Sequence, residues 1–249
     1  MNNKIRELGI SKREVDELFK VSKNIDKDYK KLLKGYPIQY LIGYSSFYGY
    51  KFLINKHTLI PRFETELLVE KTIKYIKKFF SSDVKIIDLG TGSGCIAITL
   101  SKELSNATIE GVDISLKALN IANKSNKIND TKVKFYRHNI LKELKSTYDV
   151  IISNPPYIAK NEEVENSVKK YEPKKALYAK DEGLCFYKQI LKNSINHISK
   201  KSIIAFEIGY KQAERIKGIA SYYYPKSKIL IEKDLSGKDR YLFIFNDNE

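Results

Sequence analysis

The sequence contains few of the side chains that form disulfides or metal sites. It has two cysteines and three histidines in 249 residues. Cys95 and Cys185 are isolated, with no CxxC pair, and the histidines are scattered at His57, His138 and His197. This scarcity predicts a reducing compartment, no disulfide and no bound metal.

Long apolar runs are also absent. No segment has the uncharged apolar length that a membrane span needs. The first residues, MNNKIRELGISKREVDELF, have no apolar stretch of the kind found in a secretory signal. We therefore expect a cytoplasmic protein with no membrane segment, long enough for one large domain and a small appendage.

Arginine is rare, whereas lysine is abundant. The formal net charge is +15, and arginine occurs only at Arg6, Arg13, Arg62, Arg137, Arg215 and Arg240. Proteins that read base edges favour arginine because its planar fork binds bidentately. The lysine excess fits either an acidic or RNA-associated partner or a plain compositional bias, and we expect no sequence-specific nucleic-acid binding.

Apolar runs and helical patterns alternate from residue 84 onward. The runs predict strands at Val84–Leu89, Thr108–Val112, Val133–Tyr136, Val150–Ser153, Ile203–Ile208, Ile229–Ile231 and Tyr241–Phe245. The segments between them predict helices at Cys95–Leu104, Ser115–Asn123, Leu184–Ile198 and Lys211–Tyr222. Strands that are apolar throughout and separated by helices indicate a parallel sheet covered on both faces. The last two runs are joined only by KDLSGKDR, which allows an antiparallel pair. The predicted fold is α/β, a mostly parallel Rossmann-like methyltransferase sheet with an antiparallel last strand.

The first part of the chain has a different pattern. Residues 1–35 predict short polar helices, one of them capped by Ser11. The segment SSFYGYKFLIN predicts two short strands that meet near Gly49, and an amphipathic helix is expected to start at Thr65. We therefore expect a small helical N-terminal domain, a connector that contains the hairpin, and the main domain, at residues 1–43, 44–64 and 65–249.

The segment IIDLGTGSGCIA carries three glycines between a predicted strand and a predicted helix. Such a loop makes a tight turn, lets a ligand approach the backbone and points a helix N-terminus into a crevice. Its GxGxG spacing differs from the GxGxxG of dinucleotide binders and suits S-adenosylmethionine, which has no pyrophosphate. Asp113 ends the next strand about twenty residues later, where a carboxylate can bind ribose hydroxyls. The predicted cofactor-binding residues here are Gly90, Thr91, Gly92, Ser93, Gly94 and Asp113.

The third predicted strand ends in Asn139 and Ile140. A polar residue followed by an apolar one at this edge suits the exocyclic amine and the face of an adenine. We include both in the predicted cofactor site. An ordinary strand end, without a ligand, explains the same two residues nearly as well.

The fourth predicted strand runs into Asn154, Pro155, Pro156 and Tyr157. The prolines stiffen this loop and remove two backbone donors, so its carbonyls remain as acceptors. The Asn154 side-chain oxygen and the Pro155 carbonyl can accept both hydrogens of an amide or aniline-type nitrogen. Acceptors placed there favour the geometry that develops as the nitrogen attacks a sulfonium methyl, and no general base is needed beforehand. We predict that Asn154, Pro155 and Tyr157 are catalytic and that Asn154 also contacts the cofactor. All four residues form the predicted substrate site, in which the Tyr157 ring stacks on the substrate.

Further stretches resemble the release factor glutamine methyltransferases, the HemK/PrmC family, over nearly the whole chain. They are PIQYLIG at 37–43, LIPRFETE at 59–66, EP at 172–173, AL at 176–177, DEGLCFY at 181–187, EIG at 207–209 and DLSGKDR at 234–240. The resemblance implies methyl transfer from S-adenosyl-L-methionine, with S-adenosyl-L-homocysteine as product. The implied target is the glutamine of the Gly-Gly-Gln motif in class I peptide chain release factors. It also implies that the N-terminal domain docks the release factor, and we expect a monomer.

Three features depart from the family pattern. Phe63 stands where proline is usual, and Asn139 stands where an acidic residue is common. The helical region before Pro37 is also shorter than in the family. The short helical region bears on how the partner docks, and transfer chemistry is less affected.

Two other functions fit part of the sequence. The Asn-Pro-Pro-Tyr tetrapeptide is shared with DNA and RNA methyltransferases that act on exocyclic amines of bases. Such an enzyme normally needs a target-recognition domain, for which this chain has little length to spare. A non-catalytic scaffold is the other alternative, and the intact tetrapeptide and glycine loop argue against it.

Overall fold

The computed structural model describes residues 9–247. Three short helices come first: α2 (Lys12–Val21), α3 (Ile25–Leu32) and α4 (Ile38–Ile42). Ser11 caps α2 as predicted, because its side chain accepts from the backbone of Glu14 while the Glu14 carboxylate accepts from the Ser11 backbone. The part of the predicted helical region at residues 1–8 lies outside the described residues.

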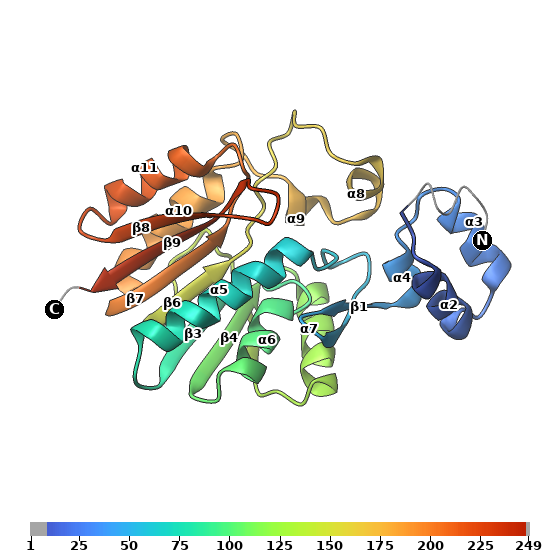
Figure 1. Ribbon diagram of the computed structural model, residues 1–249, viewed down its shortest axis with the longest axis horizontal. Helices are drawn as coiled ribbons and strands as arrows, with labels where there is room; N and C mark the ends of the chain where they lie inside the picture. The colour runs from blue at the N-terminus through green and yellow to red at the C-terminus, as the bar shows by residue number, and fades with distance from the viewer. Residues whose placement is uncertain (1–8, 248–249) are drawn as a thin grey trace.

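The three helices share a small core. Leu18, Leu32 and Ile38 are its buried residues, with half-buried apolar side chains around them. Figure 1 shows these helices at one end of the molecule, beyond the edge of the main domain. The division of the chain at residues 43 and 64 stays a prediction.

A hairpin and a long helix follow. The strands β1 (Tyr44–Phe47) and β2 (Tyr50–Leu53) pair antiparallel, as predicted. Tyr48 and Gly49 both have positive φ, which is the two-residue turn that matches the twist of a hairpin. The helix α5 (Phe63–Phe79) begins two residues before the predicted start. Thr65 does not cap it, because the Thr65 hydroxyl is buried and donates to Glu207 instead.

Seven strands form the central sheet, in the order β5-β4-β3-β6-β7-β9-β8. Their bounds are β3 (Val84–Leu89), β4 (Ala107–Asp113), β5 (Lys134–Arg137), β6 (Tyr148–Ser153), β7 (Ile198–Glu207), β8 (Lys228–Lys233) and β9 (Asp239–Asp247). The first five pair parallel, whereas β9 pairs antiparallel with both β7 and β8. The predicted fold class is therefore confirmed. The last strand does not lie at the edge of the sheet but between β7 and β8.

Helices cover both faces of the sheet (Figure 1). Together with α5, they are α6 (Cys95–Glu103), α7 (Leu116–Ile128), α10 (Cys185–Ser194) and α11 (Ala213–Tyr223). The short helices α8 (Asn166–Tyr171) and α9 (Lys174–Leu177) lie in the connection between β6 and α10, and the turn η1 (Ile195–His197) leads into β7. One core lies under α5 and α6, and a second lies under α10 and α11. The predicted helix to Ile198 ends earlier, because β7 already begins there.

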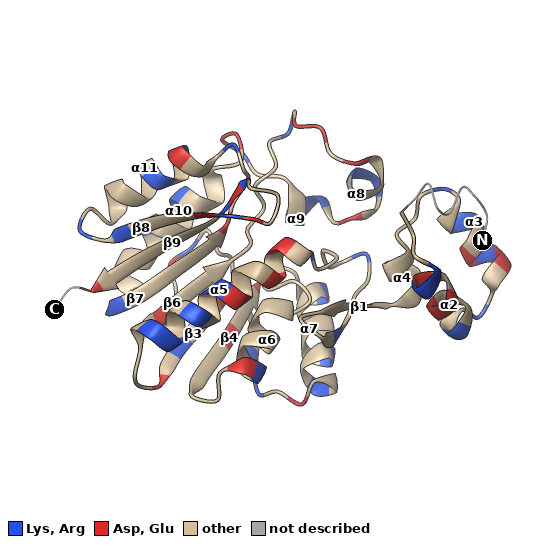
Figure 2. Ribbon diagram, in the orientation of Figure 1, with Lys and Arg blue, Asp and Glu red and all other residues tan. Residues whose placement is uncertain are grey.

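Charged side chains do not gather on one face in the view of Figure 2. Basic residues lie on helices throughout the molecule, interspersed with acidic ones on α2 and α5. Several lysines are tied to nearby groups, as Lys71 is to Glu232 and Lys31 is to Asp28.

Candidate active site

The site lies where the strand order changes direction. The chain proceeds from β3 to β4 on one side of the sheet and returns to β6 on the other, which opens a crevice at the carboxyl ends of these strands. The Ser153 hydroxyl at the end of β6 donates to the Leu89 carbonyl at the end of β3, 2.6 Å away. The two predicted loops therefore leave adjacent strands side by side.

The glycine loop is held by backbone hydrogen bonds from β4. The N–H groups of Gly90 and Thr91 both donate to the Val112 carbonyl, each at 2.9 Å. Gly92 and its two neighbouring loop glycines have positive φ. A Cβ at Gly92 would meet nothing closer than the Gly90 carbonyl at 4.0 Å, so the backbone is accessible to a ligand on that side. A positive φ disfavours any side chain there.

Packing is the reason for glycine elsewhere near this loop. A Cβ at Gly94 would lie 3.0 Å from the ring of Phe135, and one at Gly111 would lie 2.4 Å from it. Sequence spacing assigned Gly94 to the cofactor, and the structure shows that it also allows α6 to pack against the sheet. Ser93 is buried in the same turn.

Asp88 is a buried carboxyl beneath the loop that the sequence did not single out as a site residue. It is fully buried, and its Oδ2 accepts from the Thr91 hydroxyl at 2.5 Å. Burial raises the pKa of Asp88 to about 7, although the Thr91 hydrogen bond works in the opposite direction. The position of Asp88 near the end of β3, just before the glycines, is the sequence feature that could have identified it as a site residue.

Asp113 ends β4 beside the loop, as predicted. Its Oδ2 accepts from the Gly92 N–H at 3.0 Å, and its Oδ1 accepts from the Ser115 N–H at 2.8 Å. Burial raises the pKa of Asp113, and these backbone donors oppose the rise. Each carboxylate oxygen keeps a second lone pair for a hydroxyl donor. Asp113 therefore fits a ribose while it also holds the loop in place.

Asn139 and Ile140 follow β5 at the same edge. The Cδ1 of Ile140 would lie 4.0 Å from a Cβ at Gly90, so this side chain flanks the glycine loop. The Asn139 Oδ1 accepts from the Leu141 N–H at 3.0 Å and keeps a second lone pair for a donor such as an adenine amine.

The Asn154 side chain is oriented by two residues from distant parts of the chain. Its Nδ2 donates to the Thr65 hydroxyl at 3.0 Å, and that hydroxyl donates to Glu207 at 2.6 Å. Because the amide nitrogen is used in this way, the Asn154 Oδ1 remains an acceptor. The sequence assigned no role to Thr65 or Glu207 in this site.

Glu207 lies behind the catalytic loop. It is 2% exposed, and burial raises its pKa to about 7, against the effect of the Thr65 hydrogen bond and of Arg240. The Tyr157 hydroxyl lies 3.5 Å from its Oε1, and burial also raises the pKa of Tyr157. Tyr157 is therefore a neutral phenol at physiological pH.

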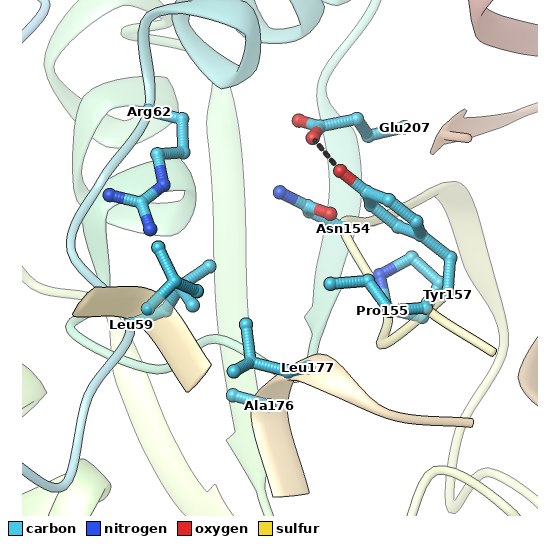
Figure 3. A pocket seen from close by; sticks show the side chains of 10 residues that line it. Leu59, Arg62, Asn154, Pro155, Tyr157, Ala176, Leu177 and Glu207 are labelled. Atoms are coloured by element: carbon cyan, nitrogen blue, oxygen red, sulfur yellow. Dashed lines mark hydrogen bonds between the residues drawn. The ribbon is translucent and has the colours of Figure 1, made fainter. Parts of the chain in front are cut away.

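A pocket of about 180 Å³ opens in front of these side chains. Figure 3 shows Asn154, Pro155 and Tyr157 on one side of it, with Arg62 and Leu59 on the other. Aliphatic side chains complete the lining: Ile158, Val168, Ala176 and Leu177. The pocket thus has polar acceptors at one wall, the Arg62 guanidinium at the opposite wall and apolar contact elsewhere, which suits a short side chain with a polar end.

An ion pair supports the wall opposite Asn154. Arg62 pairs with Glu172, whose side chain is 1% exposed, and Glu172 also accepts from the Ile60 N–H at 3.2 Å. A second cavity shares Arg62 and Val168 with the pocket and extends to the N-terminal helices. Its lining includes residues 35–39. The two cavities therefore lie side by side, one at Asn154 and the other at α4.

Two features are absent from residues 9–247. No group of three or more histidine, cysteine, aspartate or glutamate side chains there could hold a metal ion. No helix in the same range is long and apolar enough to cross a membrane.

Comparisons with known proteins agree with this geometry. Residues 64–177 match the model of the Methyltransferase small domain. A release factor glutamine methyltransferase of Enterococcus faecalis is 41% identical over 216 residues, covering 86% of this chain and 77% of that protein. One from Lactococcus lactis subsp. lactis is 36% identical over 245 residues, covering 97% and 88%. A methyltransferase structure from Pyrococcus furiosus superposes with a TM-score of 0.58 at 17% identity, covering 90% of this chain and 99% of that one, and so shares the fold.

Proposed function

We propose that this chain methylates the side-chain amide of a glutamine in a peptide chain release factor, because it belongs to the family of the release factor glutamine methyltransferases. The target is the glutamine of the Gly-Gly-Gln motif of class I factors, as the family resemblance implies. The methyl donor of the reaction is S-adenosylmethionine.

The orientation of Asn154 is the observation that best supports this function. Its Nδ2 is occupied by Thr65, so its Oδ1 can accept one N–H of an incoming amide. The Pro155 carbonyl accepts the second N–H, and the Tyr157 ring stacks on the planar amide. Fixed acceptors stabilise the charge that develops on the attacking nitrogen, so binding energy is used in the transition state.

Each group in the crevice has a distinct part in the reaction. Gly90–Gly94, Asp113 and Ile140 hold S-adenosylmethionine, which supplies an electrophilic methyl group. Asn154 and Pro155 orient the nitrogen lone pair toward that methyl group. The amide proton leaves after transfer, and no side chain has to remove it first.

A protein substrate is also supported by the shape of the site. The pocket at Asn154 and the neighbouring cavity at the N-terminal helices share Arg62 and Val168, and an extended loop that carries the modified glutamine can lie across both. We propose that the helices α2–α4 contact the body of the release factor, that the enzyme acts in the cytoplasm, and that it works as a monomer.

The base methyltransferase alternative lacks comparable support. The named relatives at 36–41% identity carry the release factor function in their names. Weak, salt-dependent nucleic-acid binding without sequence preference stays our prediction for the lysine excess.

The decisive test is methyl transfer in vitro. The protein is incubated with methyl-labelled S-adenosylmethionine and a purified class I release factor, and mass spectrometry locates the label. We expect label on the glutamine and none on a release factor in which that glutamine is replaced by glutamate. DNA and RNA serve as parallel substrates. Label on nucleic acid, or equal label on the glutamate variant, would refute the proposal.

A further inference from the structure

The Gln212 side chain joins three separate segments behind the catalytic loop. Its Nε2 donates to the Tyr157 carbonyl at 2.9 Å and to the Glu182 carbonyl at 3.0 Å. Its Oε1 accepts from the Gly209 N–H at 3.2 Å. Gln212 is 7% exposed, and three of the four hydrogen bonds that an amide can make are satisfied.

The segment that meets Gln212 has an unusual backbone. Asp181, Glu182 and Gly183 are consecutive residues with φ of 56°, 50° and 88°. Residues with a Cβ seldom adopt this left-handed region, and such conformations persist where the surroundings impose them. The ion pairs Lys188–Asp181 and Arg215–Glu182 are exposed and contribute little. The contact with Gln212 and the Tyr157 backbone is the buried interaction of this segment.

Two glycines permit this contact. A Cβ at Gly183 would lie 2.1 Å from the Tyr157 carbonyl oxygen, which no side chain can tolerate. A Cβ at Gly209 would lie 2.7 Å from the Gln212 Oε1 and 3.4 Å from the Tyr157 ring. The Tyr157 carbonyl and the Gln212 amide leave no room for a side chain at Gly183, and the Gln212 amide restricts Gly209.

The other side of the loop is held by the segment after α9. The Ile158 N–H donates to the Leu177 carbonyl at 3.0 Å, and the Ala179 N–H donates to the Ile158 carbonyl at 2.9 Å. The backbone around Tyr157 is therefore held by hydrogen bonds from this segment on one side and from Gln212 on the other. In Figure 3 the Tyr157 ring lies at the edge of the pocket, with its hydroxyl directed to Glu207.

We propose that Gln212 is a positioning residue for methyl transfer. Together with Gly183 and Gly209 it sets the depth and plane of the Tyr157 ring. Gln212 does not line the pocket and acts through Tyr157. This role rests on the proposed function, since it concerns the same reaction.

The test begins with Gln212→Met, which keeps the length of the side chain and removes its donors and acceptor. We expect kcat for release factor methylation to fall on the order of ten- to a hundredfold, because small displacements of a reacting geometry have effects of this size. Cofactor affinity, measured by calorimetry, should stay unchanged. Gln189→Met is the matched control, because Gln189 bonds only to Asn193 within α10, and it should leave kcat unchanged.

A double-mutant cycle separates positioning from general destabilisation. In a Tyr157→Ala background, Gln212→Met should have little further effect on kcat, because the ring that it positions is gone. The same fold loss in both backgrounds would overturn the proposal. If Gln212→Met does not fold, Gln212→Asn repeats the cycle with an amide that is too short to reach Tyr157.

Hydrogen exchange gives a measure that needs no substrate. In Gln212→Met, the amide of Ile158 should exchange faster than in the parent and in Gln189→Met. Unchanged exchange at Ile158 would refute the proposal that Gln212 holds Tyr157 in place. If the parent enzyme fails to methylate a release factor while this exchange difference is present, the proposed function fails and the hold of Gln212 on Tyr157 stands.

Discussion

The glycine loop and the Asn154–Tyr157 loop leave neighbouring strands, but they are held in different ways. The glycine loop is fixed from the adjacent strand, by the Val112 backbone carbonyl and the Asp113 side-chain carboxylate. The Asn154–Tyr157 loop is fixed by side chains that are far away in the sequence. Thr65 precedes Asn154 by 89 residues, and Gln212 follows Tyr157 by 55.

This difference separates two properties of the enzyme. The shape of the glycine loop depends on backbone conformation, so substitutions that the backbone cannot accept should abolish cofactor binding. The catalytic loop depends on particular hydrogen-bonding groups, so nearly isosteric substitutions should lower turnover and spare cofactor affinity. The predictions below test that separation.

The largest effect is expected at Gly92. The change Gly92→Val places a β-branched side chain at φ of 56°, on the side where the cofactor must approach. Calorimetry should detect no cofactor binding. Gly218→Val is the matched control, because Gly218 lies in α11 with nothing within 4 Å of its Cβ position. Binding by a folded Gly92→Val protein would show that the loop is not the cofactor site.

Asn154→Ala should affect turnover alone. Losing one well-placed acceptor for transition-state charge costs about 3–4 kcal/mol, so kcat should fall by two or more orders of magnitude. Cofactor affinity should change little. Tyr157→Phe should be mild, because the stacking face survives. A fully active Asn154→Ala enzyme would sink the two-acceptor mechanism.

A buried carboxyl lies behind each of the two loops. The variant Glu207→Gln tests the carboxyl behind the Asn154–Tyr157 loop. The pKa of Glu207 is raised from 4.5 to about 7 in the folded protein. Its contribution to stability is therefore fully present below pH 4.5 and is lost as pH rises toward and past 7. Between pH 5 and 8 the variant should gain roughly 2 to 3 kcal/mol over the parent in free energy of unfolding. Urea titrations at several pH values measure this. A constant difference would show that Glu207 ionises normally.

Asp113→Ala should weaken cofactor binding by roughly 1–3 kcal/mol, the usual penalty when buried hydrogen-bonding groups lose their partner. Turnover at saturating cofactor should stay close to that of the parent. Unchanged affinity in a folded variant would remove Asp113 from the ribose site.

Thr65→Val should have the smallest effect. Valine has nearly the shape of threonine but neither donates to Glu207 nor accepts from Asn154, so the Asn154 amide is free to rotate. We expect turnover to fall roughly tenfold, the value of about one net hydrogen bond. Thr65→Ser should restore activity. Equal turnover in the valine and serine variants would show that Thr65 does not orient Asn154.

Local patterns in the sequence predicted what local interactions determine. The strand before Gly90, the carboxylate at Asp113 and the hairpin at Gly49 all depend on residues close together in the chain, and the structure has each of them. The glycine spacing likewise identified the loop that β4 holds.

The support behind Asn154 could not be found in the same way. Ser153 pairs with Phe206 in the register of β6 and β7, which brings Asn154 beside Glu207. Strand order and register are set by tertiary packing, so a single sequence does not reveal that neighbour. Thr65 looked like the start of a helix, and its hydroxyl instead bonds a residue on another strand. Gln212 carried no motif at all.

The insertion of β9 between β7 and β8 has a consequence for the order of folding. Within residues 9–247, β8 joins the sheet through β9 alone, and we expect these two strands to assemble first as a hairpin. Their connecting turn is local, with the Asp234 carboxylate accepting from the backbone of Ser236 and Lys238. Hairpins with such short connections form within microseconds, whereas parallel pairing through crossover helices is slow.

We expect this hairpin to dock on β7 as one unit. In the folded protein Arg240 donates to the Ile208 carbonyl and the Tyr241 hydroxyl donates to the Glu64 carbonyl, next to the residues that orient Asn154. We therefore expect the Asn154–Tyr157 loop to reach its final geometry at this step, after the glycine loop has formed. A chain at that stage would bind its cofactor before it could transfer a methyl group.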